Sequence, residues 1–322
     1  MKVAQIGELA LLEELAAWVP GGSRVLLGLG DDCAAVSLRG KALLTTDSLV
    51  EGVHFERSWA SPAALGRKAF TVNASDIAAM GGAPAFALLS LGLPADFPVE
   101  DLREFFRAFV AEAAACGAAL VGGNLSAAPC LVISATVVGD APYGAITRAG
   151  MRVGDELYVT GTLGDAALGL RQLRQGEACG AVVNRFLEPT ARLKAGQTLA
   201  RRKLATAMID VSDGLVRDLG HLCARSGVGA VVEAWRLPLS GEYRTGVGPQ
   251  DWGPALTGGE DYELLFAVPP QRARRLDRVA RECGCPITRI GRVIERDRGI
   301  VVIDESGHPY EVQRAGHDHF AA

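Results

Sequence analysis

The N-terminal half of the chain contains apolar residues at helical spacing as well as short apolar runs typical of strands. Apolar residues that recur at three- and four-residue intervals predict helices over 6–17, from 61 to about 80, and over 99–116. Short apolar runs bounded by Gly, Pro and Asp predict strands over 24–29, 41–47, 86–93, 120–124 and 131–138. Strands and helices mixed in this way are typical of α/β or α+β layers.

The C-terminal half repeats this style with its own elements. Strands are predicted over 156–160, 207–210, 229–233, 262–268, 287–294 and 300–303. Helices are predicted from 165, over 190–203, from 214 to about 226 and over 272–283, and a loop is predicted over 241–254. A Gly-rich segment over 140–154 separates the halves. We therefore expect two α/β domains, 1–140 and 150–322.

Composition and charge narrow the classes of function. The 322 residues carry 33 Lys+Arg against 37 Asp+Glu, a net charge of −4, and 6% are aromatic. This balance argues against nucleic-acid and membrane partners. No apolar stretch reaches the length of a membrane span, and the first ten residues lack the apolar core of a secretory signal. The seven cysteines are odd in number and irregularly spaced, so we expect reduced thiols and a cytoplasmic location.

Candidate chemistry lies in acids that follow the ends of predicted elements. A single such acid is usually a turn former or a helix cap, so it is their number that suggests a common site. The acids are Asp31, Asp32, Asp47, Asp76, Asp210, Asp213, Glu260 and Asp261.

Asp76 is the acid that a turn or a cap explains least well. It follows Leu65, Ala69 and Val72 at spacings of four, three and four residues, which puts it on the apolar stripe of its helix. An ionised carboxylate there needs a cation, and the motif offers no Arg or Lys, so a metal ion is favoured over a salt bridge. Carboxylates and Thr hydroxyls without a His or Cys cluster suit Mg²⁺, which points to phosphoryl or nucleotide chemistry.

The sequence lacks the familiar nucleotide-binding loops. Gly40-Lys41 is followed by Ala42 and has no upstream glycine, so it is not a Walker A loop. Gly28-Leu29-Gly30 continues into acids instead of a third glycine, and the protein-kinase signature is absent. An ATP site in this chain must be of another kind.

Six motifs, in order along nearly the whole chain, resemble the thiamine-monophosphate kinase family. They span 28–34, 45–55, 72–81, 209–215, 257–264 and 316–320, and include the runs TTDSLVEGVHF, VNASDIAAMG, IDVSDGL and TGGEDYEL. The resemblance implies the two-domain aminoimidazole-ribonucleotide-synthetase-like fold, with a homodimer formed through the N-terminal domain and a C-terminal domain that completes the active site. It also implies transfer of the ATP γ-phosphate to thiamine monophosphate, giving thiamine diphosphate. We expect that transfer to be direct and in line.

The resemblance assigns roles residue by residue. It implies ATP contacts for Gly123, Arg148 and Ser212, with Asn124 beside them, and substrate contacts for His54 and Glu260. The expected catalytic set, acting through metal ions, is Asp76, Asp210 and Asp213. The expected Mg²⁺ ligands are Asp32, Thr45, Thr46, Asp47, Asp76, Asn124, Asp210 and Asp213.

Some residues depart from the family pattern or have a plainer interpretation. Asn124 stands where the family usually has Asp, which keeps an oxygen ligand and removes a charge. Arg314 stands where an aromatic residue is usual. From the residues alone, His54 in a predicted Val-His-Phe strand could equally be a core histidine, and Arg148 could cap a helix or pair with a Glu.

Two other functions stay open at this point. One is another ATP-using enzyme of the same superfamily. However, no Cys precedes Cys33, as selenophosphate synthetase would need, and the chain lacks the final Cys of the hydrogenase-maturation member. The other is a Mg-ATP-binding protein whose site has decayed, which Asn124 alone supports. Binding of Mg-ATP without turnover would favour that second function.

Overall fold

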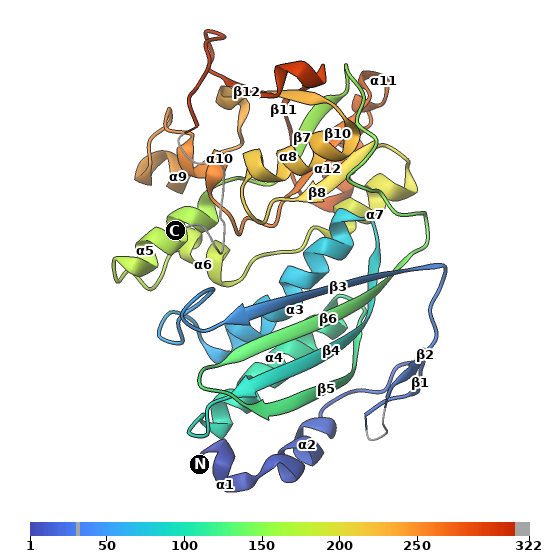
Figure 1. Cartoon of the computed structure of the whole chain (residues 1–322), viewed down its shortest axis with the longest axis vertical. Coiled ribbons are helices and arrows are strands. Elements are labelled where there is room, and N and C mark those ends of the chain that lie inside the picture. Colours follow the sequence, from blue (N-terminus) through green and yellow to red (C-terminus); the bar gives the residue numbers. More distant parts are fainter. Residues whose placement is uncertain (30–32, 313–322) are drawn as a thin grey trace. The chain divides into compact units, whose positions relative to one another are not determined.

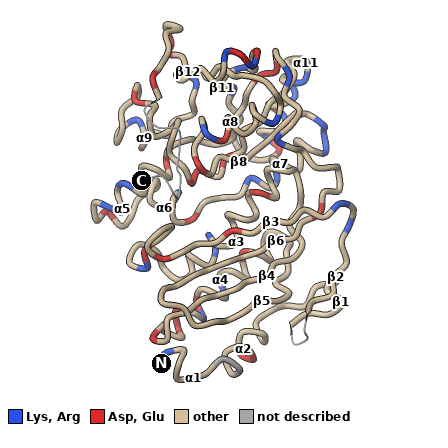
Figure 2. The backbone as a smooth tube through the Cα atoms, in the orientation of Figure 1, with Lys and Arg blue, Asp and Glu red and all other residues tan. Residues whose placement is uncertain are grey.

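The chain divides into unit 1, residues 1–77 and 82–142, and unit 2, residues 78–81 and 143–322. The structure is a computed structural model that describes residues 1–29 and 33–312. Among these residues, no helix is long and apolar enough to cross a membrane. Basic and acidic residues are interspersed along both units (Figure 2).

Unit 1 is built on a four-stranded sheet. In spatial order its strands are β3 (Lys41–Val50), β6 (Val132–Ala141), β4 (Ala83–Leu93) and β5 (Ala119–Ala127). β6 pairs antiparallel with both of its neighbours, and β4 pairs parallel with β5. Helices α3 (Pro62–Ala79) and α4 (Val99–Ala115) lie on one face of this sheet (Figure 1).

The two helices pack closely because one contact point is a glycine. A Cβ on Gly66 of α3 would lie 2.2 Å from the carbonyl oxygen of Phe105 on α4. Beside this contact, Phe70 and Phe109 meet edge to face with ring centroids 5.8 Å apart. Such a pair adds to the burial of both rings. The packing fixes α3, and with it the helix end that carries Asp76.

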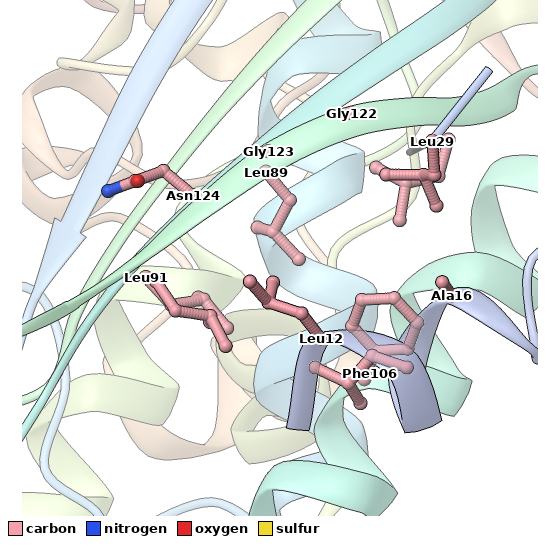
Figure 3. A pocket seen from close by; sticks show the side chains of 12 residues that line it. Leu12, Ala16, Leu29, Leu89, Leu91, Phe106, Gly122, Gly123 and Asn124 are labelled. Atoms are coloured by element: carbon pink, nitrogen blue, oxygen red, sulfur yellow. The ribbon is translucent and has the colours of Figure 1, made fainter. Parts of the chain in front are cut away.

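Four short elements complete unit 1: α1 (Val3–Ile6), α2 (Glu8–Ala16), β1 (Val25–Leu27) and β2 (Ala35–Val36). An apolar pocket of about 410 Å³, open space included, is lined by residues of α2, α4, β4 and β5. Leu12, Leu89, Leu91 and Phe106 converge on it in Figure 3. The pocket therefore lies on the helix-covered side of the sheet.

Unit 2 is built on a six-stranded mixed sheet. In spatial order its strands are β12 (Ile300–Ile303), β9 (Gly229–Glu233), β11 (Ile287–Ile294), β7 (Glu156–Thr160), β10 (Leu264–Val268) and β8 (Ala207–Asp210). β12 runs parallel to β9, and the other neighbouring strands pair antiparallel.

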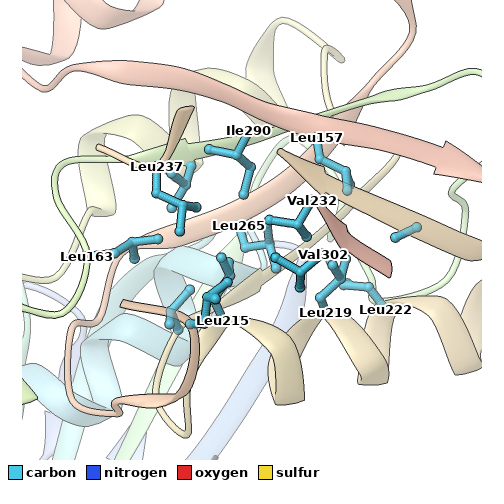
Figure 4. Close-up of a cluster of buried hydrophobic side chains, with 14 of the residues drawn as sticks. Leu157, Leu163, Leu215, Leu219, Leu222, Val232, Leu237, Leu265, Ile290 and Val302 are labelled. Atoms are coloured by element: carbon cyan, nitrogen blue, oxygen red, sulfur yellow. The ribbon is translucent and has the colours of Figure 1, made fainter. Parts of the chain in front are cut away.

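Helices of unit 2 pack against this sheet through apolar stripes. Leu215, Leu219 and Leu222 lie on one side of their helix and join Val232 and Leu265 of the sheet in a buried core (Figure 4). The longer helices are α5 (Asp165–Arg174), α7 (Leu193–Arg201), α8 (Leu215–Ser226) and α12 (Leu276–Cys283). The shorter ones are α6 (Ala181–Leu187), α9 (Gly241–Gly246), α10 (Gly253–Thr257), α11 (Pro270–Ala273), η1 (Ala234–Arg236) and η2 (Arg296–Arg298).

Several predictions of local structure were wrong. The segment 241–254 is not a loop, because it contains α9 and the start of α10. Ser240 caps α9 by accepting the N–H of Tyr243, and Pro254 lies in the first turn of α10. The strand predicted to end at Asp47 continues to Val50, so Asp47 lies inside it. The helix α6 was not predicted at all.

Candidate active site

Asp76 is bonded to a hydroxyl of the neighbouring sheet. The hydroxyl of Thr45 on β3 donates to a carboxylate oxygen of Asp76 on α3, with 2.5 Å between the two oxygens. Leu65, Ala69 and Val72 are at most 3% exposed, so the predicted apolar stripe of α3 is buried. Asp76 is half-buried at the end of that stripe. The helix therefore places the Asp76 carboxylate beside the sheet, as the spacing predicts.

Strand alternation divides the run Thr45-Thr46-Asp47 between the two faces of the sheet. Thr45 and Asp47 share the face on which α3 lies. Thr46 lies on the opposite face, where its hydroxyl donates to the carbonyl oxygen of Ala135 at 3.0 Å. Thr45, Asp47 and Asp76 therefore present their side-chain oxygens on the same side of the sheet, where they can act together.

Gly123 and Asn124 lie on the far edge strand of the same sheet. The pairing register runs from Asp47 through Ala135 and Leu89 to Gly123, so two strands separate β3 from β5. Three strand spacings amount to about 14 Å. Within one copy of unit 1, the sheet does not bring Asn124 together with Asp47.

Gly123 has a structural reason to be glycine. A Cβ at this position would lie 2.0 Å from the carbonyl oxygen of Leu89 on β4. The backbones of β4 and β5 approach so closely there that no side chain fits. Asn124 pairs with Ser90, which lies between the pocket-lining Leu89 and Leu91, so strand alternation directs its exposed side chain to the other face (Figure 3). It therefore belongs to the sheet face opposite the helices.

His54 lies in a turn, so the predicted strand around it is wrong. β3 ends at Val50, and the N–H groups of Val53 and His54 both donate to the carbonyl of Val50. The N–H of Val50 in turn donates to Nδ1 of His54 at 3.1 Å. This bond assigns the proton of the neutral, half-buried ring to Nε2. The ring is held by local backbone and offers Nε2 as a donor.

In unit 2, three predicted residues lie where β8 leads into α8. Asp210 is the last residue of β8 and is 3% exposed. Ser212 and Asp213 follow in the connecting loop and are half-buried. Nε of Arg217, one turn along α8, lies 3.4 Å from a carboxylate oxygen of Asp213. The loop thus gathers two carboxylates and a hydroxyl at one strand end.

Asp218 is a buried carboxylate in this region that the sequence analysis missed. One of its oxygens accepts the backbone N–H groups of Ser212, Asp213 and Gly214, at 3.1, 3.1 and 3.2 Å. Burial, with a smaller contribution from the charge of Asp213, raises the pKa of Asp218 to about 7. The side chain supports the loop from within the unit.

The loop that carries Glu260 has an unusual backbone. Glu260 has φ 72° and Tyr262 has φ 51°, a region that residues with side chains rarely adopt. Between them, the carboxylate of Asp261 accepts the N–H groups of Gly164 at 2.7 Å and Ala166 at 3.3 Å. Burial raises the pKa of Asp261 to about 8. Asp261 therefore ties this strained loop to the start of α5.

Backbone hydrogen bonds join the loops 211–214 and 257–263. The N–H of Glu260 donates to the carbonyl of Ser212, and the N–H of Tyr262 donates to the carbonyl of Val211, each at 2.8 Å. A Cβ on Gly259 would lie 2.4 Å from the carbonyl oxygen of Ser212. The predicted ATP contact Ser212 and the predicted substrate contact Glu260 are therefore neighbours.

Glu263 is a second buried carboxylate that sequence reasoning missed. It is fully buried and accepts from the guanidinium groups of Arg185 at 2.7 Å and Arg192 at 2.6 Å, and from the hydroxyl of Thr160 at 2.6 Å. A Cβ on Gly161 would lie 2.0 Å from the same carboxylate. Satisfied by two cations and a hydroxyl, Glu263 acts as an anchor for the segment between α6 and α7.

The remaining predicted residues include Arg148, which is exposed on the segment that follows β6. Asp32 and Arg314 lie outside the described residues. Within 1–29 and 33–312, no three His, Cys, Asp or Glu side chains gather so as to hold a metal ion. The pair that does meet, the Thr45 hydroxyl and the Asp76 carboxylate, offers only oxygen, and such donors fit Mg²⁺.

Comparison with known proteins identifies the family. The family model of the AIR synthase related protein, N-terminal domain, matches residues 30–141. The model of the AIR synthase related protein, C-terminal domain, matches residues 152–304. The thiamine-monophosphate kinase of Escherichia coli K12 is 39% identical over 309 residues, which cover 92% of this chain and 93% of the relative. The chain belongs to the thiamine-monophosphate kinase family.

Solved thiamine-monophosphate kinases share the fold of this chain. The crystal structure of the enzyme from Stenotrophomonas maltophilia K279a superposes with a TM-score of 0.84 at 37% identity, covering 94% of this chain and 98% of that one. AaThiL complexed with AMPPCP and TMP gives a TM-score of 0.78 at 37% identity, covering 99% of each chain. The predicted family and the predicted two-domain α/β fold class are confirmed.

Proposed function

We propose that this protein transfers the γ-phosphoryl group of ATP to thiamine monophosphate, forming thiamine diphosphate and ADP. The observation that carries this proposal is the likeness to AaThiL, which extends over 99% of both chains at 37% identity. That relative was solved with AMPPCP, an analogue of ATP, and with TMP. The acids and glycines that the motifs predicted for this chemistry lie in both units.

The proposed transfer is a direct, in-line displacement. A phosphate oxygen of thiamine monophosphate attacks the γ-phosphorus of ATP and forms a new P–O bond. The bond between the γ-phosphorus and the bridging oxygen breaks, and ADP leaves. Because the attacking oxygen is already anionic, the protein need not supply a strong general base. What it must supply is alignment of two anions that repel each other.

Mg²⁺ is the cation that the acidic residues fit by their chemistry. When bound, it supplies neutralisation of phosphate charge. The hydrogen bond between Thr45 and Asp76 supports this assignment because it sets two oxygen donors side by side. Asp76 in unit 1 and Asp210 and Asp213 in unit 2 would contribute to catalysis by holding Mg²⁺ ions. The residues proposed to hold such ions are Thr45, Asp47 and Asp76 on the α3 face of the unit 1 sheet, Thr46 and Asn124 on its other face, Asp210 and Asp213 in unit 2, and Asp32.

The remaining contacts follow from side-chain chemistry. ATP is proposed to contact the backbone at Gly123, the hydroxyl of Ser212 and the exposed guanidinium of Arg148, whose planar fork suits a phosphate. The substrate is proposed to contact His54, which offers Nε2 as a donor, and Glu260. A carboxylate at Glu260 complements the positive thiazolium ring of thiamine.

We also propose a homodimer formed through the face of the unit 1 sheet opposite α3 and α4. Leu44 is 71% exposed and Leu88 is 41% exposed on this face. β4 and β5 contain no charged residue, and Figure 2 draws them without blue or red. Exposed apolar side chains beside uncharged strands are typical of an interface between copies.

Each of the two predicted domains has a role in the proposed reaction. Residues 1–140 form the ATP- and Mg²⁺-binding and dimerisation domain, and residues 150–322 supply Asp210, Asp213 and Glu260. The proposed location is the cytoplasm, a reducing compartment in which the seven cysteines, all described and all free, would stay reduced.

The test incubates the protein with ATP, Mg²⁺ and thiamine monophosphate and follows the products by chromatography. We expect thiamine diphosphate and ADP in equal amounts, and no product after chelation of Mg²⁺. Rapid quench should trap no phosphoenzyme, and a phosphoenzyme that forms and decays at the turnover rate would overturn the in-line step. Mg-ATP binding without product would instead favour the decayed binding protein.

A further inference from the structure

Asp218 holds the loop between β8 and α8 from inside. Its Oδ2 atom accepts three consecutive backbone N–H groups, those of Ser212 at 3.1 Å, Asp213 at 3.1 Å and Gly214 at 3.2 Å. Asp218 is 2% exposed, so bulk water does not compete for these donors. A carboxylate with three backbone donors fixes the path of all three residues at once.

This arrangement decides which sign of charge the loop can bind. Unoccupied N–H groups before a helix commonly bind phosphate. Here the carboxylate of Asp218 already accepts the donors that precede α8, so these donors are not available to a phosphate. The loop instead carries the carboxylates of Asp210 and Asp213. The loop therefore suits a cation better than an anion.

The loop is equally constrained on its other side. Gly214 has φ 124°, and a Cβ there would lie 2.8 Å from the carbonyl oxygen of Thr257. A Cβ on Gly259 would lie 2.4 Å from the carbonyl oxygen of Ser212. The N–H of Glu260 donates to that same carbonyl at 2.8 Å. Asp218 and the segment 257–260 thus hold residues 212–214 between them.

We propose that Asp218 is a positioning residue for the phosphoryl transfer. It fixes the backbone of Ser212 and Asp213, so that their side chains are available to the Mg²⁺-bound nucleotide. The inference rests on the proposed function, because Asp213 is a metal ligand only within that proposal. Substitution of Asp218 should therefore weaken the part of nucleotide binding that depends on Mg²⁺. The part that does not depend on Mg²⁺ should stay unchanged.

The test measures binding of AMPPCP by calorimetry, with and without Mg²⁺, to wild type and Asp218→Asn. We expect the affinity with Mg²⁺ to fall about tenfold or more, the usual effect of removing a residue that orients a metal ligand. The affinity without Mg²⁺ should not change. A role that is merely structural would reduce both affinities together.

Asp155→Asn is the matched control in the same unit. Asp155 is 4% exposed and accepts the N–H of Arg152 at 3.1 Å and the hydroxyl of Thr206 at 2.8 Å. This variant should lower the melting temperature and leave both AMPPCP affinities unchanged.

Three outcomes decide between the possibilities. Equal loss with and without Mg²⁺ in Asp218→Asn, or no loss, would overturn the positioning role. If Asp218→Asn does not fold, the smaller Asp218→Ser, which keeps one acceptor, should show the same Mg²⁺-specific loss, and its absence there would overturn the role. Wild-type protein whose AMPPCP affinity gains nothing from Mg²⁺ would overturn the proposed function, and the positioning role with it.

Discussion

Asp140 on β6 is a buried carboxylate whose partners show an anchoring role. Its oxygens lie 2.6 Å from Nη1 of Arg24 and accept the N–H of Arg39 at 2.8 Å. Burial acts to raise the pKa of Asp140, but the hydrogen bonds and charges of Arg24 and Arg39 outweigh it. The pKa therefore lies below its usual value. Asp140 ties the β1–β2 ribbon to the sheet.

Asp140→Asn should destabilise the folded protein by about 2 kcal/mol at neutral pH, because charge-assisted hydrogen bonds are lost. The folded-state pKa is lowered, so the contribution is complete above the unfolded value of 3.8 and is lost as pH falls through the folded pKa. The stability difference between wild type and variant should shrink on acidification. Urea unfolding at neutral and acidic pH measures this difference, and growth of the difference at acidic pH would contradict the assignment.

The spacing argument that predicts a buried Asp76 also applies to Asp218. Both carboxylates lie on the apolar stripe of a helix, and Asp218 lies between Leu215, Leu219 and Leu222, which are fully buried. The same argument therefore predicts a buried, partnered Asp218. Its partners could not be predicted, because they are backbone N–H groups that only the path of the loop brings into reach.

The β4–β5 pair gives an element-scale prediction at adjacent glycines. Gly123→Ala should lower the free energy of unfolding of unit 1 by about 3 kcal/mol, because the added Cβ would lie 2.0 Å from the backbone oxygen of Leu89. Gly122→Ala is the matched control. Its Cβ would meet only the end of the Leu88 side chain at 2.9 Å, which can move. Thermal unfolding compares the two, and equal losses would contradict the steric account.

Element types were predictable where a long apolar period set them, as in α3 and α4. Short elements were not, because few residues carry the signal. The segment 241–254 contains four Gly and two Pro and is predicted to be a loop, yet it holds α9 and the start of α10, and Pro254 lies within the first turn of α10. His54 follows a β-branched residue and was assigned to a strand. The turn around it depends on bonds to Val50 instead.

At the scale of the whole molecule, the proposed dimer predicts that a charge on the exposed sheet face separates the two copies. Leu88 is 41% exposed on that face, so Leu88→Lys should fold but give a monomer, because the charge would be buried between the copies. Size-exclusion chromatography with light scattering measures the mass. A variant that keeps the wild-type dimer mass would contradict an interface on this face.

The order of the six motifs predicted the family and the two-domain fold, because those motifs cover nearly the whole chain. The separation of Asn124 from Asp47 was not predictable. It follows from the strand order β3–β6–β4–β5, which no local pattern contains. A motif can predict that a residue lies on a strand, but it does not predict which strands are neighbours in the sheet.

The most direct test of the account is the rate of thiamine diphosphate formation as Mg²⁺ is varied, in wild type and in Asp76→Asn. The variant keeps the shape of the side chain that bonds to Thr45 and loses its charge. We predict that wild type forms the product, and that the variant needs more Mg²⁺ and is slower by about 10–100-fold. A variant as active as wild type at every Mg²⁺ concentration, or wild type that binds Mg-ATP and forms no product, would contradict the account.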